Sequence, residues 1–342
     1  MRKGRAAGRL KWLGGAALLA LLLSHPQAAA LGAAEGMANW YACVAPALFP
    51  FMALMPLLTS PEATDAYERA LGGVMRSAFR LPGAAASAAV IGLAAGAPAC
   101  AVAARRVAAQ SGMSRGQLQR LVTSISGFSP AFLIAGVGVG MLGSARMGWL
   151  LASAQVLTQL TLLLLTRRAW GSRTEPVAAG DDAAQVQPVR AAVLAVLTIG
   201  GYMALFGALA TVARGYMGGV AANALLCAMD VPSGARLVSR LPLTAEVKLV
   251  ALAGLCGFGG VCVAAQNLGV LGGCGVKAHE YLGLRVLAGA LCGGYMAALV
   301  KLTGERGLAA VAALRENPYA LAALLAMALV APVAWRFRRT VF

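Results

Sequence analysis

The 342-residue chain is 60% hydrophobic and only 12% charged, and its mean hydropathy is +0.75. Soluble domains carry about 25% charged residues, so this composition excludes a disordered chain, a disulfide scaffold and an ordinary cytosolic enzyme. The net charge of +17 would suggest nucleic acid binding in a soluble protein. Here the basic residues lie at the ends of apolar runs, as in membrane proteins. We therefore expect an all-α polytopic membrane protein whose partner is the lipid bilayer, not nucleic acid.

The sequence offers few groups for metal binding or catalysis. Its seven cysteines show no C-x-x-C spacing, and its only histidines are His25 and His279. The run Gly138-x-Gly140-x-x-Gly143 matches the dinucleotide fingerprint, but no acid follows about 20 residues later. We expect no cofactor, no metal and no enzymatic activity. Three glycine pairs are instead typical of helix packing, namely Gly92/Gly96, Gly136/Gly140 and Gly289/Gly293.

Residues 1–31 form the first segment. A basic start, the apolar run 13–23 and the small residues 28–30 have the shape of a signal peptide. A first transmembrane helix over about 10–30 fits equally, and we favour this uncleaved helix. Cleavage would leave the topology of the remaining chain unchanged.

The first half of the chain contains several interrupted apolar runs. Pro46, Pro50 and Pro56 fall in the run 40–58, so a helix there must be kinked or broken. Residues 59–83 are mixed-charge and predict a surface amphipathic stretch. The run 84–104 is broken at Gly96-Ala97-Pro98, which favours a re-entrant hairpin. Two spans follow at 121–143 and 147–166, the first preceded by a capping box of Ser114 and Gln117.

A polar linker at 167–190 separates the two halves. Apolar runs then follow at about 190–213, 217–229, 248–270, 284–302 and 319–335. The run 217–229 is too short to cross a hydrocarbon core of about 30 Å, so we predict a second re-entrant segment there. His279 and Glu280 lie in a short loop, where a solvated pair is favoured over a proton relay.

These segments predict eight transmembrane helices and two re-entrant hairpins, with both termini in the cytoplasm. This topology places 21 of the 29 Lys and Arg on the inner side and 8 outside, as the positive-inside rule requires. The organisation is a first repeat at 32–166, the linker at 167–190, a second repeat at 191–302, and a last helix with a basic tail at 303–342.

An internal repeat relates residues 113–130 to residues 243–260. Ser114 aligns with Thr244 as a helix N-cap, and Gly127-Phe128 aligns with Gly257-Phe258. The predicted topology gives the two copies opposite directions through the membrane. Inverted repeats with broken helices build the binding sites of many secondary transporters. The alternative is a chance recurrence of Gly-Phe in a glycine-rich chain.

Three segments carry a family resemblance. The run 46–51, Pro-Ala-Leu-Phe-Pro-Phe, resembles the proline-rich second helix of the YlbJ-like sporulation integral membrane proteins, which belong to the Gate or nucleoside-recognition domain proteins. The run 129–134 resembles their Gly-Pro-x-Phe-Ile-Ile segment, and 259–266 resembles their Gly-Gly-x-x-Val-x-x-Gln segment. In addition, Gly96-Ala97-Pro98 lies where the family usually has Gly-Tyr-Pro. Ala97 therefore departs from the family pattern, as does Ser129, where glycine is usual. The resemblance covers about residues 35–300.

The resemblance implies a fold related to the core of concentrative nucleoside transporters, with inverted repeats, re-entrant hairpins and an elevator-like motion. It implies a bacterial cytoplasmic membrane, or a membrane around the forespore. The cargo implied is a small polar or anionic solute, dipicolinate-like or a nucleoside. A coupling cation and a homo-oligomer are left open.

The candidate substrate-binding residues are the polar groups and the break points of the interrupted helices. Asp230 either binds a coupling cation or caps the helix that begins near Pro232. The amides of Gln266 and Asn267 bind solute or bond between helices, and the hydroxyls near Gly127 bind solute or bond within their helix. The full set is Gly96, Pro98, Ser126, Gly127, Ser129, Pro130, Asn223, Asp230, Gly257, Phe258, Gly259, Gly260, Gln266 and Asn267.

Two functions remain in competition after the sequence is read. The first is a secondary transporter with its site between 127–130 and 257–266. The second is a membrane scaffold or assembly factor of spore formation that moves nothing. Polar residues at the break points, such as Ser129 and Gln266, favour transport because a scaffold has no need of them.

Overall fold

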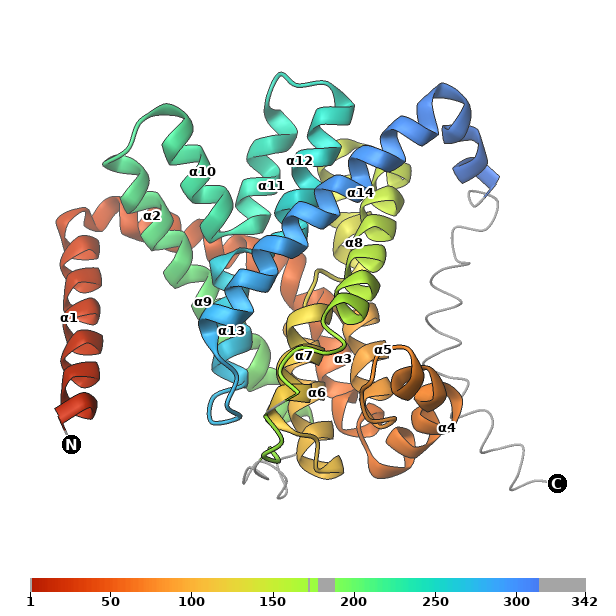
Figure 1. The fold of residues 1–342 in the computed structure, drawn as a ribbon. Helices are drawn as coiled ribbons and strands as arrows, with labels where there is room; N and C mark the ends of the chain where they lie inside the picture. The colour runs from red at the N-terminus through yellow and green to blue at the C-terminus, as the bar shows by residue number, and fades with distance from the viewer. Residues whose placement is uncertain (1, 172, 178–187, 314–342) are drawn as a thin grey trace.

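A computed structural model of the chain describes residues 2–171, 173–177 and 188–313. This part is helical and contains no strand, as the sequence predicts (Figure 1). The helices are α1 Arg2–Ser24, α2 Pro26–Asn39, η1 Trp40–Val44, α3 Ala45–Leu58, α4 Pro61–Ser77, α5 Ala85–Ala95, α6 Ala99–Ser111, α7 Arg115–Ile125, η2 Phe132–Met141, α8 Ala145–Leu165, α9 Pro188–Gly215, α10 Gly219–Met229, α11 Val231–Arg240, α12 Ala245–Phe258, α13 Gly260–Val270 and α14 Ala278–Ala313.

Four helical segments of the described chain are long and apolar enough to cross a membrane. They are Ala145–Leu165, Val189–Gly215, Ala245–Val270 and Ala278–Leu302, and α1 with α2 makes a fifth if the bent pair is one span. The prediction of an all-α polytopic membrane protein is therefore confirmed. The predicted last span, 319–335, lies outside the described residues.

The predicted first helix, 10–30, is divided in the structure. The chain bends by 102° between α1 and α2, at His25 and Pro26. Proline has no backbone N–H to donate to the preceding turn, so the break at Pro26 follows from its chemistry. Beyond it, α2, η1 and α3 run on from Pro26 to Leu58, and α3 accommodates Pro50 and Pro56 inside the helix. The proline-rich run is thus a continuous helical segment and is not broken.

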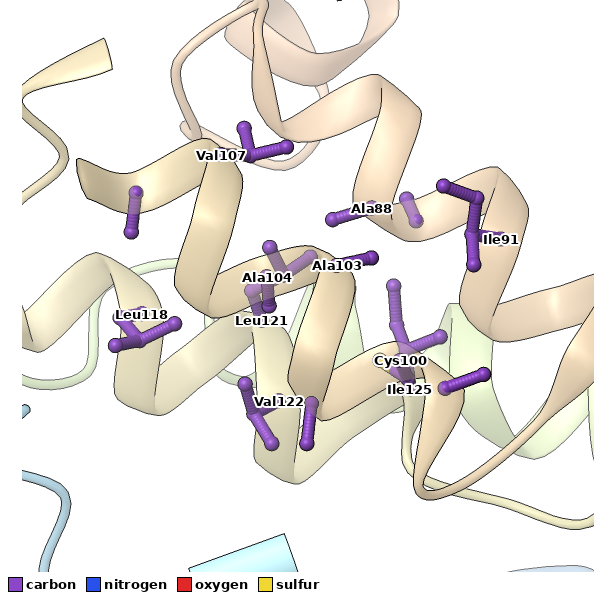
Figure 2. Close-up of a cluster of buried hydrophobic side chains, with 14 of the residues drawn as sticks. Ala88, Ile91, Cys100, Ala103, Ala104, Val107, Leu118, Leu121, Val122 and Ile125 are labelled. Atoms are coloured by element: carbon purple, nitrogen blue, oxygen red, sulfur yellow. The ribbon is translucent and has the colours of Figure 1, made fainter. Parts of the chain in front are cut away.

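A small-residue core joins α5, α6 and α7. Ala88, Ala103 and Ala104 are fully buried there, against Leu121 and Ile125 (Figure 2). Alanine side chains let helix backbones approach closely, which is how helices associate in lipid. The α5–α6 hairpin is therefore held on α7, and the predicted capping box of Ser114 and Gln117 begins α7.

The α5–α6 hairpin and the α10–α11 hairpin enter the molecule from opposite sides. The turn from α6 to α7 lies at the lower edge of Figure 1, and the loop from α11 to α12 lies at the upper edge. The second hairpin includes α11, so it is longer than the predicted segment 217–229. Both hairpins end near the centre, where they meet interruptions in the helices that follow them.

Glycines mediate two of the closest helix contacts. A Cβ atom on Gly289 would lie 2.9 Å from the Gly254 carbonyl oxygen, which explains the tight packing of α14 on α12. The packing role predicted for Gly136 and Gly140 is wrong, since a Cβ on either would meet only its own helix. Gly138 instead lies against Gly148 of α8. The π-helical winding of η2 changes which glycines face the neighbour.

The contact of α2 with α9 gives a test of this packing. A Cβ on Gly36 would overlap the backbone of Met203, whereas a Cβ on Gly201 would meet nothing within 4 Å. We expect Gly36→Leu to destabilise the protein by more than about 1–3 kcal/mol, because backbone cannot move aside as a side chain can. Thermal unfolding in detergent should show a lower midpoint for Gly36→Leu and an unchanged one for Gly201→Leu. Equal midpoints would contradict this packing.

Candidate functional site

The tip of the first hairpin lies against the interruption between α7 and η2. The Ala97 backbone N–H donates to the Gly127 carbonyl oxygen at 2.7 Å. Gly96 has φ +71° and ψ −164°, a conformation that is essentially restricted to glycine. A Cβ there would lie 2.5 Å from the Ser129 nitrogen. Gly96 therefore permits the hairpin tip to contact the break at 126–131 backbone to backbone.

The second hairpin repeats this arrangement with different residues. Asp230 ends α10 and begins α11, and its carboxylate accepts from the Ser233 N–H at 3.2 Å. The predicted cap is therefore present. Gly259 and Gly260, with φ of +88° and +78°, form the break between α12 and α13. A Cβ on Gly260 would lie 3.0 Å from the Val231 side chain, so the hairpin tip meets the break here as well.

The two tips and the two breaks converge on one small central cavity of about 50 Å³. Its walls come from η1, α3, α9, both hairpin tips, the first break and the part of α13 that follows the second break. Liquid water occupies about 30 Å³ per molecule. In this conformation the cavity therefore has no room for a solute much larger than water. The lining residues are Val44, Leu48, Ala95, Ala97, Pro98, Phe128, Ser129, Phe132, Ile199, Met203, Asp230, Pro232, Cys262, Val263 and Gln266.

The polar groups of the cavity are hydroxyl, carboxylate and amide. Ser129 is 9% exposed, and its Oγ accepts from the Phe132 N–H at 3.2 Å. Asp230 is 4% exposed, and Gln266 is 5% exposed with its Nε2 donating to the Cys262 thiol at 3.3 Å. Each keeps hydrogen-bonding capacity beyond these bonds. Together they could bind a small solute with both donors and acceptors.

Of the fourteen predicted residues, the structure places Pro98, Ser129, Asp230 and Gln266 on the cavity wall. Gly96, Gly127, Gly259 and Gly260 shape the tips and breaks around it. The remaining six lie off the cavity wall. Asn223 is half-buried on α10, and Asn267 donates to the Tyr281 hydroxyl at 2.6 Å. Ser126 and Pro130 lie within the first break, and Gly257 and Phe258 end α12, because the second break comes after them.

Three buried residues near the breaks were not predicted. Gln159 Nε2 of α8 donates to the Ile125 carbonyl oxygen at 2.7 Å, which satisfies the end of α7. Gln155, one turn earlier, is 2% exposed, lies against Gly127, and neither its Nε2 nor its Oε1 has a hydrogen-bond partner. Polar side chains inside the apolar run 147–166 were the signal that could have identified them.

Arg285 of α14 is the third unpredicted residue. It is 2% exposed, and its guanidinium donates to the carbonyl oxygens of Gly257 and Phe258 at the end of α12. The last carbonyls of a helix carry partial negative charge, so an arginine is well suited to this break. Its Nη1 has no partner. Arg285 was not predicted as a site residue because it lies at the edge of the apolar run 284–302, where a charged residue is usual.

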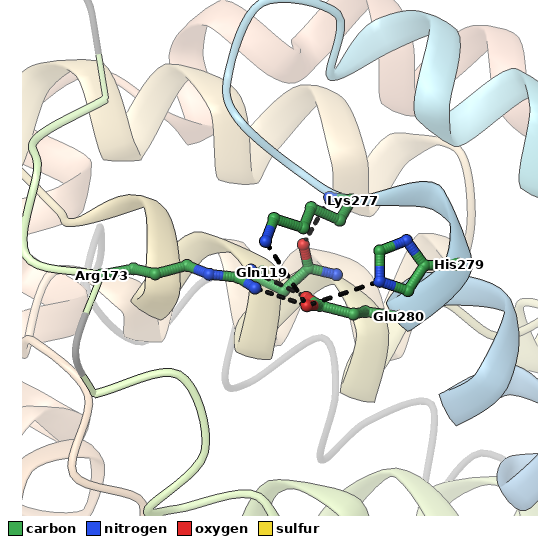
Figure 3. Close-up of polar contacts among 5 residues, drawn as sticks. All are labelled: Gln119, Arg173, Lys277, His279 and Glu280. Carbon is green, nitrogen blue, oxygen red and sulfur yellow. Dashed lines mark hydrogen bonds and ion pairs between the residues drawn. The ribbon is translucent and has the colours of Figure 1, made fainter.

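A polar cluster on the lower side connects the linker to both halves (Figure 3). Arg173 donates to Glu280 through Nη1 at 2.7 Å and also through Nη2. This hydrogen bond raises the pKa of Arg173 above its usual value. The Lys277 backbone N–H donates to the Gln119 side chain at 2.8 Å. Glu280 is thus paired with the linker, so it is not the solvated loop residue that the sequence predicts.

Comparison with known proteins identifies a relative of this chain. Sporulation integral membrane protein YlbJ of Bacillus subtilis (strain 168) is 28% identical to the chain over 317 residues, covering 80% of this chain and 78% of YlbJ. The chain is therefore similar to YlbJ over most of the length of both proteins. No family model and no solved structure matches it. The resemblance drawn from three short segments is thus confirmed for the YlbJ-like proteins, and the relation to Gate domains stays a prediction.

The tip of the first hairpin can be tested with a pair of glycines. Gly96 and Gly112 precede and follow α6 with positive φ, but a Cβ on Gly112 would meet nothing within 4 Å. We expect Gly112→Ala to cost about 1 kcal/mol, the usual penalty of a left-handed alanine. Gly96→Ala should cost clearly more, because its Cβ meets the Ser129 backbone. The two thermal unfolding midpoints decide this, and equal losses would refute the tip contact.

The role of Arg285 is tested by removing its charge. Arg285→Met leaves the Gly257 and Phe258 carbonyl oxygens unpaired, at a cost of about 1–3 kcal/mol for each buried group. Lys301→Met is the control, because Lys301 is exposed on the same helix. We expect a lower unfolding midpoint for Arg285→Met alone. A midpoint equal to that of the control would show that the break is stable without the arginine.

Proposed function

We propose that this YlbJ-like protein is a secondary transporter of a small polar or anionic solute, a dipicolinate-like dicarboxylate or a nucleoside. The observation that carries the proposal is the central cavity, on which two hairpin tips and two helix breaks converge. Broken helices are tolerated in lipid only where the freed backbone is buried or lines a cavity. Transporters use such breaks near the midplane for binding.

The polar groups of the cavity support the choice of solute class. Ser129 and the Gln266 amide can donate to carboxylate or hydroxyl oxygens, and Asp230 can accept from a hydroxyl or hold a cation. An acid at this depth is costly unless it has a use. With only about 50 Å³ open, the solute enters after one hairpin moves away from its break.

A second cavity of about 270 Å³ extends from the first toward α3, α6, α9 and α13. Pro98, Ile199 and Gln266 line both cavities. A solute that left the centre by movement of the first hairpin would therefore pass these three side chains. The two cavities in series favour passage over simple storage of a ligand.

The sporulation setting comes from the relative. YlbJ is named a sporulation integral membrane protein, and the Ser129 hydroxyl and the Gln266 amide supply donors for a carboxylate. We place this chain in the cytoplasmic membrane or in a membrane around the forespore, with the side bearing the α6–α7 turn toward the cytoplasm. The excess of Lys and Arg predicted for that side supports this orientation.

Uptake by reconstituted protein tests the proposal. Proteoliposomes should accumulate radiolabelled dipicolinate or nucleoside above protein-free vesicles. Ser129→Ala combined with Gln266→Ala should reduce uptake by roughly 10- to 100-fold, as expected for the loss of two buried hydrogen bonds of about 1 kcal/mol or more each. Asn223→Ala is the matched control, because Asn223 lies on α10 outside the cavity wall.

Unfolding midpoints of each variant establish that the protein tested is folded. A folded wild-type protein that moves neither solute, and whose midpoint neither solute raises, would contradict transport. The scaffold or assembly function would then be favoured. Uptake that Asn223→Ala reduces as strongly as the double variant would place the site elsewhere.

A further inference from the structure

A larger cavity of about 760 Å³ lies between α2, η2 and α11. We call it the arginine groove, because Arg236 and Arg240 are the charged residues of the described chain that line it. Its other walls include Asn39, Phe132, Ala135 and Gly140. Phe132 also lines the central cavity, so the two spaces adjoin at this side chain.

The groove is positively charged, and one of its two charges is held in place. None of the described residues that line it is acidic. The Arg236 guanidinium donates to the Asn39 side-chain oxygen, and Asn39 Nδ2 donates to the Ser233 hydroxyl at 3.3 Å. Asn39 itself is 6% exposed. A buried amide thus fixes one arginine, while Arg240 is exposed at the end of α11.

The arginine groove lies on the side of the molecule where few basic residues are expected. Arg240 ends α11, just before the loop at the upper edge of Figure 1, opposite the α6–α7 turn. The positive-inside rule explains basic residues on the side of that turn. It does not explain two arginines in one hollow on the other side, where only 8 of the 29 Lys and Arg are predicted. A function in binding explains them.

The barrier between the groove and the central cavity is aromatic. Phe128 and Phe132 stack with ring centroids 4.7 Å apart, and both line the central cavity. Phe128 belongs to the break between α7 and η2, and Phe132 is the first residue of η2. A movement of the break against the first hairpin would therefore displace Phe128 and disturb the stacked pair.

We propose that the arginine groove binds small dianions and delivers them to the central cavity from the side opposite the α6–α7 turn. The planar arginine fork pairs with carboxylates, and a positive hollow raises the local concentration of an anion before it passes Phe132. The inference rests on the proposed transport function and adds to it an entry site, the arginine groove, for the anionic solute.

Equilibrium binding of radiolabelled dipicolinate to the detergent-solubilised protein is the first test. Arg240→Gln should raise the Kd by about tenfold at low salt, the loss of roughly one charge-assisted contact. Arg214→Gln removes the same charge at the end of α9 outside the groove, and should leave the Kd unchanged. No binding by the folded wild type, or equal effects of both variants, would overturn the proposal.

Uptake separates this inference from the proposed function. In vesicles of neutral lipid, Arg240→Gln should raise the KM for dipicolinate and leave nucleoside uptake unchanged. If binding depends on Arg240 but no uptake is seen, the groove is supported as a binding site and transport is contradicted. If uptake is the same with and without Arg240, transport is supported and the groove proposal is contradicted. An effect seen only with anionic lipid present would assign the groove to a lipid headgroup and overturn the proposal.

A membrane-impermeant thiol reagent can test whether the anion passes through the groove. Ala135→Cys places a thiol in the groove, and Val220→Cys places one on the exposed start of α10, 85% exposed and outside it. Modification should reduce dipicolinate binding only for Ala135→Cys. Unchanged binding after complete modification of Ala135→Cys would exclude the groove from the path of the anion.

Discussion

A helix interrupted inside a bilayer must find partners for its freed backbone groups within the protein, because lipid offers none. This constraint governs the centre of the molecule. The Gly127 carbonyl oxygen accepts from Ala97 in the opposing hairpin tip, and the Ile125 carbonyl oxygen accepts from Gln159. At the second break, Arg285 donates to two carbonyl groups. Each break is thus satisfied by a different element, so the elements cannot separate without losing hydrogen bonds.

The same constraint explains why polar and small residues gather at one depth. A tip can approach a break only where no Cβ intervenes, which requires Gly96 and Gly260. The backbones that meet there bring Ser129, Asp230 and Gln266 to the wall of one cavity. Phe132 connects this space with the arginine groove on one side, and Pro98 with Gln266 connects it with a further cavity on the other.

Part of this organisation could be predicted from local sequence. The capping box at Ser114, the caps at Thr244 and Asp230, and the glycine interruption at 96–98 are encoded within a few residues, and each is present. Residues that pack against each other can lie far apart in the sequence, so these contacts were harder to predict. Gly136 and Gly140 face the groove and not a helix, because the winding of η2 changed the face that meets α8.

The sequence by itself determined that this is a helical, multi-pass membrane protein with interrupted helices, since apolar length and glycine–proline breaks are local properties. It also carried the YlbJ-like resemblance in three short segments. Only the tertiary structure decided which breaks meet, that Arg285 satisfies one of them, and that Asn223 and Asn267 lie off the cavity wall. The reason is that a buried polar group is defined by partners far away in the chain, such as Arg285 to Gly257, and no local pattern records them.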